Sequence, residues 1–503
     1  MNRDGNFAQA LATAAADHPH RDCLRLGAAA DAPTWSYADL DTWIQRMAGA
    51  LHAAGVTPGD RVLVQVEKSA EAVALYLGCL RLGAVYVPLN TAYTPEEVTY
   101  FLGDAEPRVY VCGPTADSTA AAAAGVTVLT LDGEGLGSLR EAARRADPFT
   151  GVEHREARDL AAIVYTSGTT GRSKGAMLSH ANLASNARVL REAWGWRDDD
   201  VLLHALPIFH VHGLFVALHC ALLGATPIIF LTRFDPAAVL AALPRATVMM
   251  GVPTFYTRLL ECDDLDRSEC AHMRLFVSGS APLTEQTFAA WEAHTGHRIL
   301  ERYGMSETMM NTSNPLDGER VPGTVGYPLP GVEARITGDE GQVLEPGEVG
   351  IIEVRGPNVF SGYWRMPEKT AEEFRADGFF VTGDLGTMAD DGRIAIVGRA
   401  KDLVITGGYN VYPKEIEHLL DEIPGVVESA VIGVPHPDFG EGVVAVLVTG
   451  AAKVTQADVA RALDGRLARF KQPKAVVSVE ALPRNAMGKV QKNVLRERFR
   501  DLF

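Results

Sequence analysis

The sequence predicts an α/β protein with a large N-terminal domain of helix-covered, mostly parallel sheets plus a β-rich subdomain, and a small α+β C-terminal domain. Buried strands alternate with amphipathic helices through the first three hundred residues. From about Val332 short strands interrupted by Gly, Asp and Pro follow, and a helix–strand pattern then returns. At 503 residues the chain is too long for one compact core, so several domains are expected.

The first predicted elements alternate in type. RVLVQV (61–66) is interpreted as a buried strand, SAEAVALYLGCLRLG (69–83) as an amphipathic helix and AVYVPL (84–89) as the next strand. Further predicted strands are RVYVC, VTVLTL, ATVMMG and MRLFVSG, with helical segments such as FDPAAVLAAL between some of them. Ligands of such folds bind in the loops that follow the carboxyl ends of the strands.

The apolar stretch 213–231 is interpreted as a buried helix, a Gly turn and a short strand over 227–231. A transmembrane span is not expected, because the stretch contains His219, Gly224 and Pro227.

Changes of pattern predict the domain boundaries. The N-terminal domain, expected to bind ATP and the acid, covers 1–400, and 332–398 form its β-rich subdomain. The C-terminal domain covers 401–503, because a charged turn at 399–402 separates two apolar strands.

Composition excludes several classes of protein. The formal net charge of −16 argues against a nucleic-acid partner, which would require a basic face. The six cysteines are scattered without a C-x-x-C pair, which is typical of reduced thiols in the cytoplasm. The N-terminus lacks the pattern of a secretion signal, so a cytoplasmic protein with neither membrane nor nucleic-acid partner is expected.

A phosphate-binding loop is predicted in YTSGTTGRSKG (165–175), directly after the strand AAIVY. Glycines let backbone N–H groups approach phosphate oxygens, hydroxyls add donors, and a lysine adds charge. The residues assigned to ATP here are Thr166, Ser167, Gly168, Thr169, Thr170, Gly171 and Lys174. The loop is not of the Walker type, because Lys174 is followed by Gly175; the alternative is an ordinary flexible surface loop.

This segment resembles the phosphate loop of the adenylate-forming superfamily, which includes acyl-CoA synthetases, luciferases and peptide-synthetase adenylation domains. YGMSET (303–308), TGD (382–384), GRAKDLVITGGYNVYPKEIE (398–417) and PRNAMGKVQK (483–492) match further motifs in the expected order. The resemblance covers essentially the whole chain. It implies an AMP-forming acid–thiol ligase that uses ATP, Mg²⁺ and coenzyme A.

The resemblance implies a role for each matched residue. Lys489 would bridge the carboxylate and the α-phosphate, and Glu307 with Thr166 would hold Mg²⁺. Asp384 would bind the ribose hydroxyls, with Arg399 beside the ribose and phosphate. Tyr303 would stack on adenine, and the remaining ATP-binding residues would be Ser280, Ala281, Glu301, Arg302, Gly304, Met305 and Ser306.

Two half-reactions at one site imply a mobile C-terminal domain. The superfamily rotates this domain about a hinge, which matches Lys401 here. Gly407 and Gly408 would let the backbone pass close to coenzyme A, although they could also simply form a turn. His210 is implied at the acyl pocket as a third catalytic residue beside Lys489 and Glu307; a core histidine is the alternative.

GVPTFYTRLL, SGSAPL, LERYGMSETMMNTSNP and VPGTVGYPLPGV resemble segments of malonyl-CoA synthetases, which join malonate to coenzyme A. Arg258 would then pair with the distal carboxylate of malonate, with Arg302 assisting. Val211 and Met309 would border the acyl group, and methylmalonate is a further candidate substrate. An exposed arginine on the outside of a helix is the alternative for Arg258.

Other functions stay open at this stage. The same chemistry on another short carboxylic acid is one, a peptide-synthetase adenylation enzyme is a second, and a non-catalytic nucleotide or acyl sensor is a third. A sensor would be expected to lack Lys489, Glu307 or Asp384, and all three are present. A lysine acetyltransferase is a candidate partner, because acetylation would remove the charge of Lys489.

We predict that Arg258→Ala lowers activity with malonate by about tenfold or more while ATP binding persists, because truncating one partner of a buried charge pair costs roughly 2–5 kcal/mol. Steady-state kinetics with malonate and acetate measure the change. An unchanged preference between the two acids would contradict the assignment.

Overall fold

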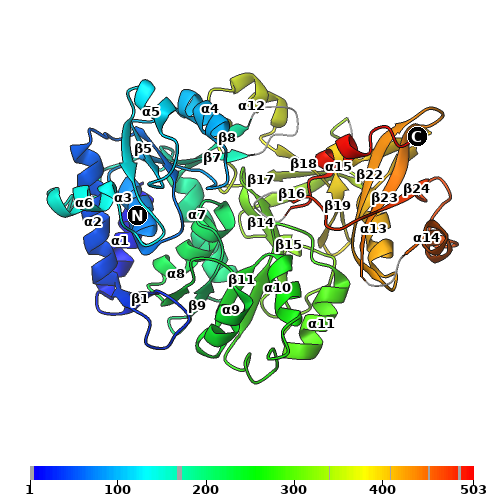
Figure 1. The fold of residues 1–503 in the computed structure, drawn as a ribbon, viewed down its shortest axis with the longest axis horizontal. Helices are drawn as coiled ribbons and strands as arrows, with labels where there is room; N and C mark the ends of the chain where they lie inside the picture. Colours follow the sequence, from blue (N-terminus) through cyan, green and yellow to red (C-terminus); the bar gives the residue numbers. More distant parts are fainter. Residues whose placement is uncertain (1–4, 167–172, 339, 408, 451–453, 485–488) are drawn as a thin grey trace.

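The computed structural model describes residues 5–166, 173–338, 340–407, 409–450, 454–484 and 489–503 (Figure 1). The predicted ATP-binding residues Ser167, Gly168, Thr169, Thr170 and Gly171 and the predicted coenzyme A residue Gly408 lie outside these ranges.

A six-stranded sheet forms the first part of the N-terminal region. Its order is β6 (Thr127–Thr130), β5 (Val109–Cys112), β3 (Arg61–Gln65), β4 (Val85–Pro88), β7 (Leu160–Thr166) and β8 (Lys174–Ser179). All neighbours are parallel except β7 and β8, whose antiparallel ladder ends where Thr166 faces Lys174. The predicted phosphate-loop motif therefore begins and ends at adjacent strand ends.

A nine-stranded sheet follows. Its order is β15 (Tyr327–Pro328), β14 (Met309–Ser313), β13 (Leu300–Met305), β12 (Leu275–Ser278), β11 (Val248–Gly251), β9 (Leu202–His204), β10 (Ile228–Phe230), β1 (Asp22–Arg25) and β2 (Thr34–Ser36). The strands from β13 to β1 are parallel, and both edges are antiparallel. The predicted strands and their largely parallel arrangement are thus confirmed.

Helices cover both sheets (Figure 1). They are α1 (Phe7–Asp17), α2 (Tyr37–Ala53), α3 (Ala70–Arg81), α4 (Pro95–Ala105), α5 (Thr119–Ala123), α6 (Ser138–Arg145), α7 (His180–Ala193), α8 (His219–Leu223), α9 (Pro236–Ala242), the 3₁₀ turn η2 (Leu243–Arg245), α10 (Pro253–Leu260) and α11 (Glu285–Thr295). Every residue of α3 is buried, so the helix is not amphipathic, contrary to the prediction. Its two charged residues are paired, Glu71 with Arg140 and Arg81 with Asp41.

The apolar stretch 213–231 folds as predicted into buried helix, turn and strand. A π-helix, η1 (His212–Leu218), continues directly into α8, and β10 follows after Gly224. π-Helical turns are rare and are frequent at functional sites. None of the helices within the described ranges is long and apolar enough to cross a membrane.

The β-rich subdomain is a four-stranded antiparallel sheet. Its order is β16 (Glu333–Thr337), β17 (Gly350–Arg355), β18 (Phe380–Met388) and β19 (Ile394–Arg399). The short helix α12 (Pro367–Glu373) lies between β17 and β18 in sequence. Asp384 and Arg399 face each other in the ladder between β18 and β19, which brings two predicted ATP-binding residues together.

A smaller α+β part ends the chain (Figure 1). Its sheet runs β21 (Tyr409–Val411), β20 (Val404–Thr406), β23 (Gly440–Thr449) and β22 (Val426–His436), with β24 (Ala475–Val479) paired to β23. Its helices are α13 (Pro413–Asp421), α14 (Gln456–Leu463) and α15 (Lys492–Arg498). Two apolar clusters of its own support it, so the predicted fold class is confirmed.

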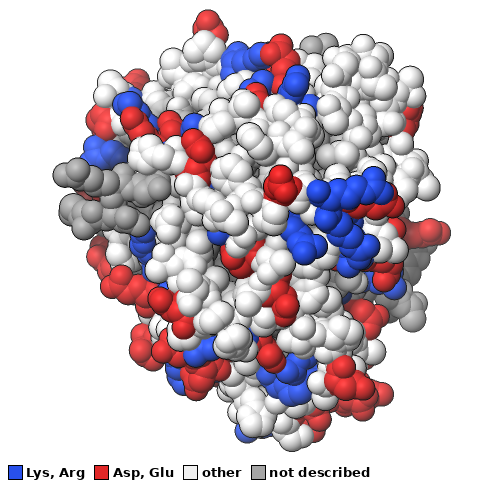
Figure 2. All heavy atoms as spheres, turned by 90° about the vertical axis from the view of Figure 1, so that its left-hand side faces the viewer, with Lys and Arg blue, Asp and Glu red and all other residues white. Residues whose placement is uncertain are grey.

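The surface carries charges of both signs. On the face shown in Figure 2, acidic and basic side chains are interspersed among uncharged ones. Although the net charge of the chain is −16, this face carries basic as well as acidic side chains.

Candidate active site

Several strands of the large sheet end along one edge, and the candidate residue Ser280 lies there. His204 ends β9, Gly251 ends β11, and Ser280 follows β12 by two residues. The motif YGMSET begins at Tyr303 inside β13. Because β9, β11, β12 and β13 are parallel, their carboxyl ends lie along one edge of the sheet. The structure therefore gathers segments that are far apart in the sequence.

Three residues form the expected nucleotide end of the site. The Tyr303 hydroxyl donates to Asp384 Oδ2 at 2.6 Å, and Arg399 Nε lies 2.7 Å from Asp384 Oδ1. The negative charge of Asp384 raises the pKa of Arg399. Each carboxylate oxygen keeps a second lone pair, so Asp384 can still accept hydrogen bonds from ribose hydroxyls. The tyrosine ring is held in place by the same carboxylate.

Glu307 is a buried carboxylate that a tyrosine links to the partly exposed Glu373. It is 5% exposed, and burial raises its pKa. The Tyr363 hydroxyl lies 3.2 Å from Glu307 Oε1 and 2.7 Å from Glu373 Oε2. Lys174 Nζ donates to Glu373 Oε1 at 2.9 Å. Tyr363 and Glu373 were not predicted from the sequence, because their segment FSGYWRMPEKTAEEF (360–374) matches none of the motifs on which the predicted site rests.

Glu307 and Thr166 have the chemistry that Mg²⁺ requires. A carboxylate and a hydroxyl offer oxygen ligands to a hard cation. The Thr166 hydroxyl donates to the backbone oxygen of Lys174 at 3.4 Å, so its own lone pairs remain available. The raised pKa of Glu307 reflects a carboxylate whose charge burial disfavours, and a nearby cation would stabilise that charge.

Lys489 extends from the C-terminal part toward residues of the N-terminal part. Lys489 is exposed, and desolvation by the surrounding protein together with the positive charge of Arg399 lowers its pKa to about 8. Asp384 and Glu307 act on it in the opposite direction. Lys489 is therefore close enough to both carboxylates for their negative charges to act on its ammonium group.

Arg302 is a buried cation that lacks a full set of partners. It is 2% exposed, and its Nε and Nη2 atoms have no hydrogen-bond partner within the described part of the chain. A Cβ at Gly279 would lie 2.5 Å from Arg302 Cζ, so the glycine makes room for the guanidinium. Burial lowers the pKa of Arg302 to about 9. Unpaired buried charge is costly, and an anionic ligand would relieve that cost.

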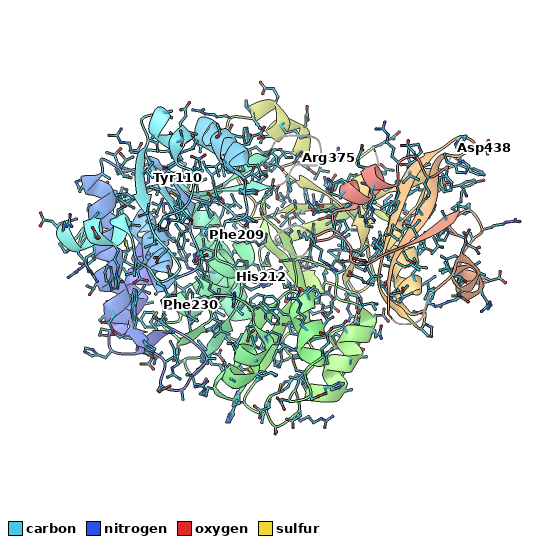
Figure 3. The ribbon with its side chains drawn as sticks, in the orientation of Figure 1. Tyr110, Phe209, His212, Phe230, Arg375 and Asp438 are labelled. Carbon is cyan, nitrogen blue, oxygen red and sulfur yellow. The ribbon has the colours of Figure 1, made fainter. Side chains whose placement is uncertain are left out.

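Two histidines lie beside this guanidinium. Burial, together with the positive charges of Lys489 and Arg302, lowers the pKa of His210 to about 3. The backbone N–H of His212 donates to His210 Nδ1 at 3.3 Å, so the proton of neutral His210 is on Nε2. His210 can thus donate a hydrogen bond to an oxygen of the acid. His212, near the centre of the molecule in Figure 3, lies 3.3 Å from the Ser280 hydroxyl through its Nδ1.

Backbone strain coincides with the site. Ser280 and Met309 have φ values of +70° and +50°, in the left-handed region that non-glycine residues rarely adopt. Both belong to the set assigned from the sequence, Ser280 to ATP and Met309 to the acyl group. Strain of this kind is maintained only where the surrounding structure requires it, and it is common at active sites.

Arg258 differs from Arg302 in its surroundings. It is exposed on α10, whose buried residues are Tyr256 and Leu259. Its pairing with malonate therefore stays a prediction, and the buried charge expected for the pocket is found at Arg302. Val211 and Met309 are buried, at 2% and 0% exposure.

The remaining assigned residues are placed as follows. Glu301 is buried, its pKa is raised by burial to about 8, and Oε1 accepts from the Leu283 backbone N–H at 3.2 Å. Lys401 is exposed in the 3₁₀ turn η3 (Ala400–Asp402), between the two parts of the chain. Gly407 has φ +57°, which suits a residue without Cβ. Ala281, Gly304, Met305 and Ser306 lie in or next to β12 and β13.

Comparison with known families matches nearly the whole chain. Residues 11–364 match the family described as AMP-binding enzyme, and residues 415–489 match the AMP-binding enzyme C-terminal domain.

Individual relatives include enzymes with different acids. The chain is 35% identical to a malonate–CoA ligase of Arabidopsis thaliana, with 96% of this chain and 88% of the relative covered. It is 36% identical to a feruloyl-CoA synthase of an Amycolatopsis species, with 96% of each covered. It is 56% identical to MatB from Rhodopseudomonas palustris over 99% of both chains; the TM-score is 0.96 to the ATP-bound crystal structure and 0.85 to the apo structure.

The lowered pKa of Lys489 predicts that its amine reacts at lower pH than that of an ordinary lysine. Competitive labelling with an amine reagent, followed by mass spectrometry, should give a midpoint near pH 8 for Lys489. Lys369 is the internal control, because its hydrogen bond to Glu372 raises its pKa. Co-titration of the two lysines would contradict the described surroundings of Lys489.

Proposed function

The chain belongs to the AMP-binding enzyme family, and on that basis we propose that it joins malonate to coenzyme A through an acyl-adenylate, giving malonyl-CoA, AMP and pyrophosphate. The observation that carries the choice of acid is the buried, incompletely paired guanidinium of Arg302. The malonate–CoA ligase of Arabidopsis thaliana among its relatives supports the same choice.

An acid with a second carboxylate completes this pocket. A carboxylate beside Arg302 would accept from Nε and Nη2, the two donors that lack partners, in the planar arrangement that guanidinium favours. An apolar acyl chain would leave the buried charge unpaired, which costs free energy. Gly279 leaves room for the guanidinium, because a Cβ at this position would lie 2.5 Å from Arg302 Cζ.

In the first half-reaction an oxygen of the proximal carboxylate attacks the α-phosphorus of ATP, and pyrophosphate leaves. Lys489 stabilises the negative charge shared between the carboxylate and the α-phosphate. The Nε2–H of His210 donates to the acid and orients it. Asp384 and Tyr303 hold the ribose and adenine, and Lys174 lies at the end of the loop expected to bind the phosphates.

Mg²⁺ fits the oxygen donors Glu307 and Thr166, and when bound it would supply positive charge against the phosphates. In the second half-reaction the thiol sulfur of coenzyme A attacks the carbonyl carbon of the adenylate. The thioester forms, AMP leaves with the electrons of the broken C–O bond, and the thiol proton passes to solvent.

A division of the chain at 400/401 belongs to the same proposal. Lys489 serves the first half-reaction, and the segment with Gly407 and Gly408 serves the second, after rotation about Lys401. The exposed position of Lys401 in a short 3₁₀ turn supports a hinge there, because few packing contacts would oppose rotation.

We also propose that Lys489 is a target of a lysine acetyltransferase in the cytoplasm. Its exposure and lowered pKa favour acetylation, which would remove the charge that adenylation requires. The six free cysteines support a reducing compartment.

The function is tested by pyrophosphate release with malonate, methylmalonate, succinate, acetate and octanoate, each with and without coenzyme A. Malonate should give the highest kcat/KM, with methylmalonate next, and acyl-CoA should form only with coenzyme A present. Higher kcat/KM with acetate or octanoate would reject malonate as the substrate, and ATP binding without pyrophosphate release for any acid would favour a sensor.

Replacing Lys401 with Pro should slow the thioester-forming step while adenylate formation continues, because proline restricts backbone rotation at the hinge. Single-turnover measurements resolve the two steps. Equal slowing of both would indicate general damage and would argue against a hinge at this residue.

A further inference from the structure

The lysine that ends the phosphate-loop motif is already paired with an anion of the protein. Lys174 Nζ donates to Glu373 Oε1 at 2.9 Å and lies 4.2 Å from the centre of the Tyr363 ring. The two charged side chains are 18% and 20% exposed, so solvent screens this pair only in part. The contact joins the start of β8 to the last residue of α12 across 199 positions of sequence.

The carboxylate of Glu373 has two further partners. Lys369 Nζ lies 3.2 Å from Oε1, and the Tyr363 hydroxyl donates to Oε2 at 2.7 Å. If Lys174 moved away, Glu373 would keep one cation and one hydroxyl donor. The departure of Lys174 therefore does not leave a half-buried carboxylate without partners, which would be costly.

The ion pair between Lys174 and Glu373 does not serve to neutralise a buried helix. None of the residues of α12 is buried. The Glu373 carboxylate therefore pairs with the ammonium group of Lys174, which a phosphate oxygen would otherwise contact. The same tyrosine that donates to Glu373 also contacts Glu307, so the pair borders the expected metal site.

We propose that Glu373 is an internal counter-ion that competes with the polyphosphate of ATP, and with pyrophosphate, for Lys174. Lys174 pairs with Glu373 before nucleotide binds, turns to the phosphates when ATP is bound, and returns to Glu373 as pyrophosphate leaves. Glu373 is thus a positioning residue that lowers affinity for both anions and speeds product release. This inference rests on the proposed function, because it takes ATP as the ligand of the loop.

Glu373→Gln removes the competing charge and keeps the size of the side chain. The variant should bind ATP and pyrophosphate about fivefold more tightly, as expected for loss of roughly 1 kcal/mol of competing interaction. Glu372→Gln is the matched control: it makes the same change one position earlier, where the carboxylate contacts Lys369 at 3.0 Å. Calorimetry with ATP in the absence of acid, and with pyrophosphate alone, gives both dissociation constants.

The outcomes separate this inference from the proposed function. No ATP binding by the unaltered protein would reject the function itself. ATP binding that is unchanged or weaker in Glu373→Gln overturns the counter-ion role, and weaker binding would identify Glu373 as a structural support of the loop. Tighter binding is a result that damage to the fold does not produce.

The same substitution in a variant without Lys174 tests whether Glu373 acts through that lysine. In Lys174→Met, Glu373→Gln should leave the ATP dissociation constant unchanged, because the competed lysine is absent. Equal tightening in both backgrounds would mean that Glu373 acts through general repulsion of the phosphates, which overturns competition for Lys174.

Discussion

The site depends on the alternation of side chains along β13. Neighbouring residues of a strand point to opposite faces, so Arg302 and Tyr303 extend to different sides of the same backbone. Arg302 lies against Gly279 near the two histidines, while Tyr303 donates to Asp384 of β18. In the proposed reaction, one strand would thus separate the acid from the nucleotide and keep them within reach of each other. A one-residue shift in its register with β12 would exchange the two faces and destroy both halves of the site.

Burial shifts the pKa of several groups around that strand. It lowers the pKa of Arg302 and of the histidines, and it raises the pKa of Glu301 and Glu307. Fully paired groups would have less need of a ligand, whereas these are held in an environment that disfavours their charges. The ligands of the proposed reaction are a dicarboxylate, a polyphosphate and a metal ion. Their charges have the signs needed to neutralise the charged groups of the site. Electrostatic complementarity therefore extends over the site as a whole.

The fold was largely predictable from sequence because its signals are local. Strands such as β5 and β11 are continuous apolar runs, and the motifs that resemble a known superfamily lie at strand ends or turns. Contacts between distant segments were not predictable. Lys174 and Glu373 are 199 positions apart, and the sequence around neither residue indicates that the other is its partner. The contrast between exposed Arg258 and buried Arg302 was missed for the same reason. A predicted position on a helix, such as that of Arg258, does not determine how much of a long side chain is exposed to solvent.

The contacts between the N-terminal and C-terminal parts of the chain include exposed charged side chains. The chain superposes on ATP-bound MatB with a TM-score of 0.96 and on apo MatB with 0.85. Between the parts, His418 of α13 lies 3.9 Å from Glu285 of α11, and both side chains are substantially exposed. Such a pair contributes little free energy. The charges of Arg399, Asp384 and Glu307 also act on Lys489 across the two parts, and a ligand that binds one arrangement more tightly would shift the population toward it.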